Sequence, residues 1–193
     1  MENSTINIHA ELIARCRDRD QIAQYEIYQL YSKAMFNTAL RICALQEEAE
    51  DVLQESFLSA FRNIDSYRED ATFGAWLKRI VVNKAITSLR KSQKEALMIE
   101  EVEEYQSLEN SSVNISELSV DRVKYAMMDL PKGFRSVLSL YLFEGYDHKE
   151  ISEILGITES TSKSQYKRAK DKLKQILQKE VNYGWVRKIY STE

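Results

Sequence analysis

Apolar residues along the chain recur mostly at steps of three and four, the spacing of one face of an α-helix. One such row comprises Leu53, Phe57, Ala60, Phe61 and Ile64. A second helix is expected from about Ala71 to Leu89, with apolar positions at Phe73, Trp76, Leu77, Ile80, Val81 and Ile86. The alternation of a β-strand is absent, and one proline and five glycines leave few breaks. The pattern therefore predicts an all-α fold.

Residues 147–177 predict two helices joined by a tight turn. Asp147 stands three residues before Glu150, the spacing of a reciprocal N-terminal cap. Gly156 follows the first helix, where a left-handed stop favours a residue without Cβ, and Thr158 can cap the second helix. The buried stripe of that helix is expected at Ser162, Tyr166, Ala169, Leu173 and Ile176. This pattern is typical of a helix-turn-helix that reads DNA, and a plain amphipathic hairpin is the alternative.

The distribution of charge matters more than its sum. The net charge of −3 alone argues against a nucleic-acid ligand. However, residues 42–61 and 95–117 carry only acids among their charged side chains, and residues 71–94 carry only bases. Bases also predominate over residues 158–179. Because local potential steers a polyanion, the two basic blocks keep nucleic acid as a candidate ligand.

Composition also predicts how the chain is divided. We expect a first helical domain at residues 6–91 and a second, the helix-turn-helix domain, at residues 119–178. The acidic segment 92–118 between them is expected to be a flexible or partly helical linker, because so long a loop is unusual inside one domain. Residues 179–193 form an aromatic tail, for which packing on the second domain and contact with a partner both remain open.

Isolated cysteines and histidines exclude some kinds of chemistry. Cys16 and Cys43 are far apart, which favours reduced thiols in a cytoplasmic protein over a disulfide. His9 and His148 have no second ligand at a useful spacing, so we expect neither a metal nor a cofactor, and we expect His148 to be either a surface residue or a cap-adjacent residue of the first helix of the hairpin. No catalytic cluster, secretory signal or membrane-spanning run is visible, and no enzyme activity or membrane insertion is expected.

Three segments resemble bacterial sigma factors of the small, two-domain extracytoplasmic-function type. EAEDVLQESF at 48–57 resembles the family's acidic helix, and YREDATFGAWLKRIVVNKAI at 67–86 resembles its F-R…F-x-x-W-L-x-R-I-x-x-N-x-A-I segment. LPKGFR at 130–135, followed by the helix-turn-helix, resembles its promoter-reading domain. The blocks stand in the family's order within about residues 10–178. The resemblance implies a bacterial transcription initiation factor that lends promoter specificity to RNA polymerase and is not itself an enzyme.

The resemblance also implies a role for each surface. The acidic helix is expected to dock on the clamp coiled coil of core RNA polymerase through Glu48, Asp51, Gln54 and Glu55. The next loop and helix are expected to hold the melting promoter element as a single strand through Asn63, Tyr67, Lys78, Arg79, Ile80, Asn83, Lys84 and Arg90. The helix-turn-helix is expected to read the upstream element as duplex through Ser160, Lys163, Ser164, Lys167 and Arg168. An anti-sigma factor is expected as a further partner.

Simple chemistry is compatible with these roles. Tyr67 can stack on a base, Asn83 offers a donor and an acceptor to a base edge, and the lysines and arginines can hold phosphates. Plain alternatives exist: a solvated face for the acids, and core packing for Phe73 and Trp76, which we favour for those two.

Three residues depart from the family pattern. Ser162, Gln165 and Tyr166 stand where a hydrophobic residue, an arginine and a leucine are common. Ser162 is expected to weaken packing of the reading helix, and Gln165 to remove a phosphate contact. Two other functions remain as alternatives: a dimeric helix-turn-helix repressor or activator on a palindrome, and a helical module whose basic faces bind an acidic protein.

Overall fold

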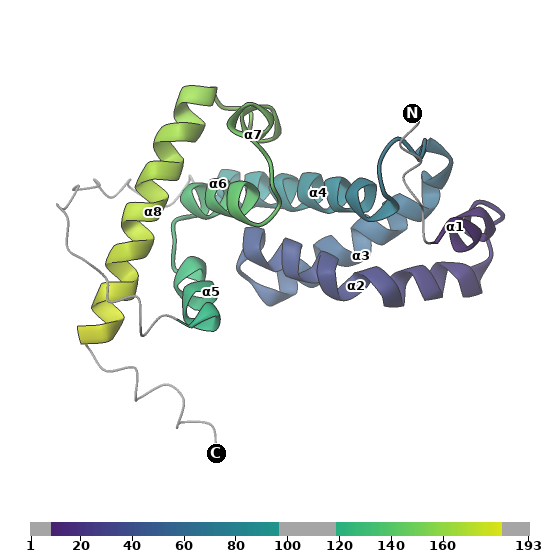
Figure 1. Ribbon diagram of the computed structural model, residues 1–193, viewed down its shortest axis with the longest axis horizontal. Coiled ribbons are helices and arrows are strands. Elements are labelled where there is room, and N and C mark those ends of the chain that lie inside the picture. The colour runs from purple at the N-terminus through teal and green to yellow at the C-terminus, as the bar shows by residue number, and fades with distance from the viewer. Residues whose placement is uncertain (1–8, 97–118, 183–193) are drawn as a thin grey trace, which may run out of the picture. The chain divides into compact units, whose positions relative to one another are not determined.

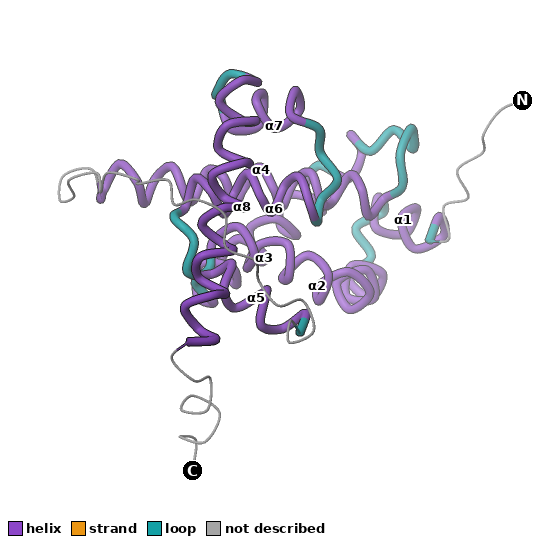
Figure 2. The backbone as a smooth tube through the Cα atoms, turned by 60° about the vertical axis from the view of Figure 1, so that its left-hand side comes forward, coloured by secondary structure: helices purple, strands orange, loops and turns teal. Residues whose placement is uncertain are grey.

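The computed structural model describes residues 9–96 and 119–182, with side chains described for 9–91 and 119–178. Throughout these ranges the regular structure is helical, with no strand (Figure 2). The chain divides into two compact units, residues 1–98 and 99–193. The predicted all-α fold with two helical domains is therefore confirmed. Most of the predicted linker and the aromatic tail lie outside the described residues.

Unit 1, residues 1–98, is built around three long helices. Its elements are α1 (Ala10–Arg17), α2 (Gln21–Cys43), α3 (Gln46–Arg62), the short 3-10 turn η1 (Ile64–Ser66) and α4 (Phe73–Ala96). Helices α2, α3 and α4 all pack against one another, and α1 packs on α2 and η1 (Figure 1). Helix α1 therefore lies beside η1, the turn that directly follows α3.

Every element of unit 1 contributes to one core. Its fully buried large side chains are Ile13, Ile27, Ile42, Ile64, Phe73, Leu77, Val81 and Val82. Phe73 is 1% exposed, and its ring lies 5.4 Å from each of the rings of Tyr31, Tyr67 and Trp76. Full burial of one such side chain contributes roughly 1.5–3 kcal/mol, so this cluster is a main source of stability for the unit. Most residues of the predicted apolar rows are confirmed as core positions, whereas Phe61, Trp76 and Ile80 are half-buried.

Local residues explain where the helices of unit 1 begin and end. The Asp20 carboxylate accepts bonds from the backbone N–H groups of Ile22 and Ala23, which caps α2. Arg15 pairs with Asp20 at 2.7 Å, and these bonds lower the pKa of that carboxyl. Thr72 accepts a bond from the Ala75 N–H at the start of α4. At its other end α4 continues to Ala96, so the first residues of the predicted linker, which was expected to be flexible or partly helical, are helical.

In unit 2, residues 99–193, the described range 119–182 contains four helices. They are α5 (Val120–Met128), α6 (Lys132–Leu142), α7 (His148–Leu155) and α8 (Glu159–Asn182). Helices α5, α6 and α7 all pack against α8 (Figure 1). The core cluster of buried residues comprises Met127, Leu130, Leu138 and Ala169, with Phe134, Tyr166, Leu173 and Ile176 packed against it. The predicted stripe of α8 is therefore its core face.

Two buried arginines hold α5 in place by bonding to backbone carbonyls. Arg122 is 7% exposed and donates to the Leu177 carbonyl of α8 at 2.8 Å. Arg135 is 4% exposed and donates to the carbonyls of Met128 and Leu130 at the end of α5. A buried guanidinium needs such partners because an unpaired buried charge is costly.

The turn between α7 and α8 forms as the sequence predicts. Asp147 and Glu150 make both bonds of the capping box. Gly156 ends α7 in the left-handed region at φ 65°, and Thr158 Oγ1 accepts a bond from the Thr161 N–H at 3.1 Å. Local residues therefore determine this turn, which sets the entry of α8.

Cys16 and Cys43 are both buried, and neither takes part in a disulfide, as expected for reduced thiols. Burial raises the pKa of the Cys16 thiol. Among the described residues no helix is long and apolar enough to cross a membrane, and no group of His, Cys, Asp or Glu within them gathers as a metal site.

Candidate functional site

The acidic face predicted to dock on a partner lies on α3. Asp51, Gln54 and Glu55 are exposed. Glu48 differs: it is half-buried, and its Oε2 atom is shielded from solvent without a hydrogen-bond partner among the described residues. Helical spacing puts Asp51, Gln54 and the apolar Leu58 on one side of α3, and Leu58 is 55% exposed. A mixed acidic and apolar surface of this kind suits a basic protein partner with an apolar patch.

The basic residues of α4 form a neighbouring surface. Arg79, Asn83 and Arg90 are exposed at spacings of four and seven, which places them on one helix face. Lys78 is half-buried and lies off this face by helical spacing, and Ile80 is half-buried. The predicted set is therefore brought together only in part.

One ion pair joins the two predicted surfaces of unit 1. Lys84 Nζ lies 3.2 Å from Glu55 Oε2, linking α4 to α3. Lys84 is half-buried and Glu55 is exposed, so water screens the pair and it contributes little to stability, about 0–1 kcal/mol. The ion pair shows that the acidic surface of α3 and the basic surface of α4 lie next to each other on adjacent helices.

Tyr67 corrects a prediction. Its side chain is 3% exposed, and its hydroxyl donates to the Ala71 carbonyl at 2.7 Å. The ring packs edge-on against Phe73 and tilted against Trp76. Burial raises the pKa of the phenol. The structure therefore places Tyr67 in the core rather than at the surface where a base could stack, because the loop folds its single aromatic inward.

Asn63 ends α3 just before the η1 turn. Its side-chain N–H group donates to the Ser59 carbonyl at 2.8 Å, and the residue is exposed. The exposed residues that follow η1, from Arg68 to Thr72, form the rest of the 67–72 loop between η1 and α4. Asn63 and this loop flank the start of the α4 surface.

The five residues predicted to read duplex DNA share one exposed face of α8. They are Ser160, Lys163, Ser164, Lys167 and Arg168, all exposed and opposite the buried stripe. Lys163 pairs with Glu159 at 2.6 Å, and this bond lowers the pKa of the Glu159 carboxyl. Ser164 donates to the Thr161 carbonyl of its own helix. The face is thus basic, polar and at the N-terminal half of a helix, as needed for contact with base edges in the major groove.

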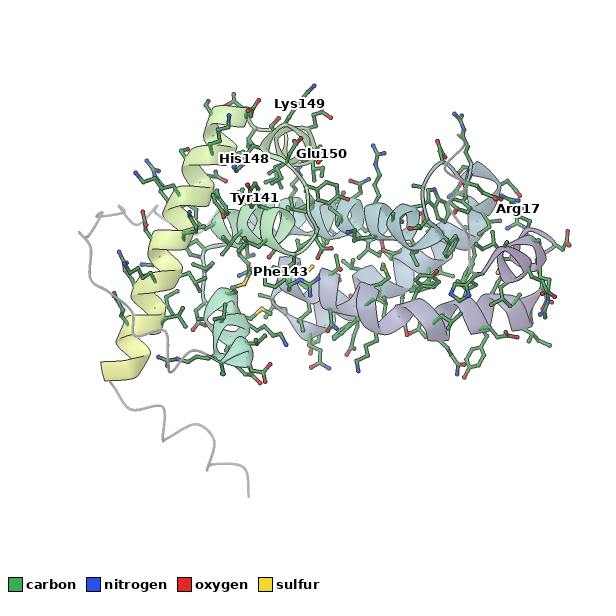
Figure 3. All side chains as sticks on the ribbon, in the orientation of Figure 1. Arg17, Tyr141, Phe143, His148, Lys149 and Glu150 are labelled. Carbon is green, nitrogen blue, oxygen red and sulfur yellow. The ribbon has the colours of Figure 1, made fainter. Side chains whose placement is uncertain are left out.

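Behind this face lies a contact that sequence reasoning missed. Ser162 is fully buried, and its Oγ atom lies 2.9 Å from His148 Nδ1 at the start of α7. The His148 ring stacks on Tyr141 of α6 at 4.8 Å (Figure 3). The Tyr166 ring of α8 lies 4.5 Å from that of Tyr141. We call these four residues the His148 cluster. It joins three helices of unit 2.

The His148 cluster overturns the expectation for Ser162. Ser162 does not leave a packing defect, because a hydrogen bond replaces the apolar contact that the family pattern provides. His148 directly follows the Asp147 cap of α7, which agrees with the cap-adjacent alternative, and its ring is half-buried in an aromatic stack. The joint departure of Ser162 and Tyr166 from the family pattern was the signal available in the sequence, since two changes one turn apart on a buried face indicate a common partner.

Comparison with known proteins decides the family. Residues 27–95 match Sigma-70 region 2, and residues 121–173 match Sigma-70, region 4. The chain is 31% identical over 159 residues to the ECF RNA polymerase sigma factor SigM of Bacillus subtilis, covering 81% of this chain and 96% of that protein. This chain belongs to the ECF RNA polymerase sigma factors. It is therefore a transcription initiation factor that confers promoter specificity on RNA polymerase.

Other relatives agree with this family. SigM of Mycobacterium tuberculosis is 30% identical over 170 residues, covering 88% of this sigma factor and 84% of that protein. The solved structure of the sigma factor RpoE bound to the anti-sigma factor NepR from Bartonella quintana matches with a TM-score of 0.54 at 23% identity, covering 80% of this chain and 96% of that one. The solved structure of CnrH in complex with the cytosolic domain of CnrY matches with a TM-score of 0.51 at 23% identity, covering 88% of this chain and 96% of that one. Membership in the family sets aside the repressor and the acidic-protein module as alternatives.

The His148 cluster leads to a stability prediction for the sigma factor. Ser162→Ala should lower the free energy of unfolding by about 1 kcal/mol, because the His148 nitrogen loses its partner in a half-buried site. A double-mutant cycle with His148→Ala should give a coupling of about 1 kcal/mol. The measurement is denaturant unfolding of the full chain, with amide hydrogen exchange to localise the change to α7 and α8.

Ser164→Ala is the matched control for this cycle. Ser164 lies on the exposed face of the same helix, and its hydroxyl bonds within α8. Its change should stay within about 0.5 kcal/mol and show no coupling to His148→Ala. A coupling near zero between Ser162 and His148 would contradict the role assigned to the hydrogen bond.

Proposed function

We propose that this sigma factor divides promoter recognition between its two units. The exposed face of α8 reads the upstream element as duplex in the major groove. The α4 surface and the 67–72 loop hold the melting element as a single strand. The α3 face docks on core RNA polymerase. The chain performs no chemistry of its own and acts in the bacterial cytoplasm, where the polymerase works.

The observation that carries this proposal is the composition of the α8 face. Three basic side chains (lysine or arginine) and two serine hydroxyls lie together on its exposed side, while the opposite side packs in the core. Lysine or arginine pairs with guanine edges in the major groove, and the remaining cations pair with phosphates. In unit 1, the exposed Arg79, Asn83 and Arg90 offer phosphate and base-edge partners on one side of α4.

Two modest DNA contacts suit a factor that acts only as part of a larger machine. When both units are tethered to one polymerase, the second contact becomes intramolecular, and its effective concentration rises. The free chain should then bind promoter duplex weakly, and binding should tighten in the holoenzyme. The strong salt dependence of phosphate contacts should appear in both cases.

Run-off transcription tests the proposal directly. Purified core polymerase and a pool of genomic fragments from the source organism should give transcripts that require this chain, and sequencing their 5′ ends maps the promoters. Lys163→Ala with Lys167→Ala should then reduce transcription from a mapped promoter by about tenfold or more, at about 1–3 kcal/mol for each good base contact. Lys124→Ala with Lys149→Ala, exposed lysines off α8, is the matched control. Tight binding to a palindrome without polymerase would count against this function.

We also propose that a protein inhibitor covers these surfaces when the factor is silent. RpoE and CnrH, to which the chain is similar in fold, were solved with the anti-sigma factor NepR and with the cytosolic domain of CnrY. Affinity purification of the chain from its own cells, followed by mass spectrometry, should recover a partner that blocks transcription when it is added back.

A further inference from the structure

The 67–72 loop is held by a side chain from distant sequence. Arg17, the last residue of α1, donates through Nη2 to the Tyr67 carbonyl at 3.0 Å and to Glu69 Oε1 at 3.1 Å (Figure 3). Arg17 precedes the segment that matches Sigma-70 region 2, which begins at residue 27. The family match therefore gives this residue no role, and α1 contributes to the region from outside it.

Helix α1 is a fixed base for this contact. Two of its own side chains, Ile13 and Cys16, are buried in the core, at 1% and 0% exposure. Two residues beyond Arg17, Arg19 donates to the Phe61 carbonyl near the end of α3 at 2.9 Å. The end of α1 is thus tied both to α3 and to the loop that follows η1.

The 67–72 loop contains an unfavourable backbone conformation, which contacts from outside the loop can stabilise. It contains no glycine, yet Glu69 lies in the left-handed region at φ 66°, which is unfavourable for a residue with a Cβ atom. On its inner side the Tyr67 hydroxyl bonds to the Ala71 carbonyl. On its outer side Arg17 binds the Tyr67 carbonyl and the Glu69 carboxylate. The loop is therefore fastened on both sides.

We propose that Arg17 is a positioning residue that holds the 67–72 loop in the shape required to capture the melted promoter strand. This inference rests on the single-strand role proposed above for unit 1. Electrostatics supports the same role, because Glu69 and Asp70 would both repel a polyanionic strand, and Arg17 neutralises the first of them. The exposed ion pair alone contributes little; the bond to the partly buried Tyr67 carbonyl is what fixes the loop.

The test compares Arg17→Gln, Arg17→Lys and Arg15→Gln in full-length factor assembled with core polymerase. Arg15→Gln is the matched control, because it removes an ion-paired arginine of the same helix that does not bond to the loop. Three quantities are measured: affinity for core polymerase, affinity of the holoenzyme for a single-stranded non-template oligonucleotide from a mapped promoter, and hydrogen exchange of residues 67–72.

Arg17→Gln should weaken binding of the single strand about tenfold, which corresponds to about 1.4 kcal/mol, and should speed hydrogen exchange in the loop. Polymerase affinity should stay unchanged, since the α3 face is intact. Arg17→Lys keeps a donor and the charge, so it should recover at least part of the loss. Arg15→Gln should bind the strand like the wild type.

Wild-type strand affinity and loop exchange in Arg17→Gln would overturn the inference. So would an equal loss of strand binding in Arg15→Gln, because the effect would then come from α1 in general. Failure of the proposed function looks different: the wild-type holoenzyme itself would show no affinity for the single strand.

Discussion

Reversing the charges of Asp51 and Glu55 together, as Asp51→Lys with Glu55→Lys, is expected to weaken binding to core RNA polymerase on the order of 100-fold. Both side chains are exposed on α3, so the substitutions should leave the fold intact. The loss follows from placing cations against the basic surface that the proposal assigns to the polymerase, where like charges repel at short range. Binding of a fluorescently labelled factor to core polymerase measures the effect.

Two controls separate docking from general electrostatics. Glu11→Lys with Asp18→Lys changes the net charge by the same amount at two exposed positions, one on α1 and one directly after it, and it should leave polymerase affinity within about twofold, because charges beyond a Debye length are screened. Lys84→Gln removes the ion pair to Glu55 without touching the α3 acids. If the α1 reversal weakened binding as much as the α3 reversal, the acidic face of α3 would not be the docking site.

Tyr67→Ala is expected to lower the free energy of unfolding of unit 1 by about 3–4 kcal/mol, a large fraction of the stability of a small domain. The reason is the position of the ring at 3% exposure between Phe73 and Trp76. Tyr67→Phe should cost only about 1 kcal/mol, because it removes the hydroxyl bond to Ala71 and keeps the packing. Denaturant unfolding followed by the fluorescence of Trp76, in a Trp185→Phe background, measures both.

Tyr25→Ala is the matched surface control for this series. Tyr25 lies on α2 of the same unit and is 61% exposed, so its loss should change the unfolding free energy by no more than about 0.5 kcal/mol. The opposite result for Tyr67→Ala, with unchanged stability and loss of promoter melting alone, would restore the base-stacking role that the sequence first favoured.

Local signals explain why the helix-turn-helix was predictable. Asp147, Glu150, Gly156 and Thr158 act on backbone groups within a few residues of themselves, and each forms the bond or turn that its type favours. The buried stripe and the exposed face of α8 follow from the helical period in the same way. The sequence therefore predicted correctly that the acidic residues Asp51 and Glu55 of α3 and the basic residues of α8 lie on exposed helix faces.

The end of α4 shows where such signals weaken. Polar residues 92–96 carry no apolar marker of a helix, yet the helix continues through them to Ala96. Extending an existing helix adds one hydrogen bond for each residue that is fixed, so polar residues with good propensity can follow a strongly apolar segment. The residues that open the predicted linker are therefore helical, which agrees with a linker that is partly helical.

Sequence periodicity and capping chemistry were sufficient for the helical fold, its two units and the exposed faces of α3 and α8, because these depend on neighbours within one or two turns. Tertiary packing was needed for the rest. It buries Tyr67, joins Ser162 to His148, pairs Glu55 with Lys84 and brings Arg17 to the loop 50 residues away. Each of these contacts links different elements, and no local pattern encodes which side chain of one helix meets which group of another.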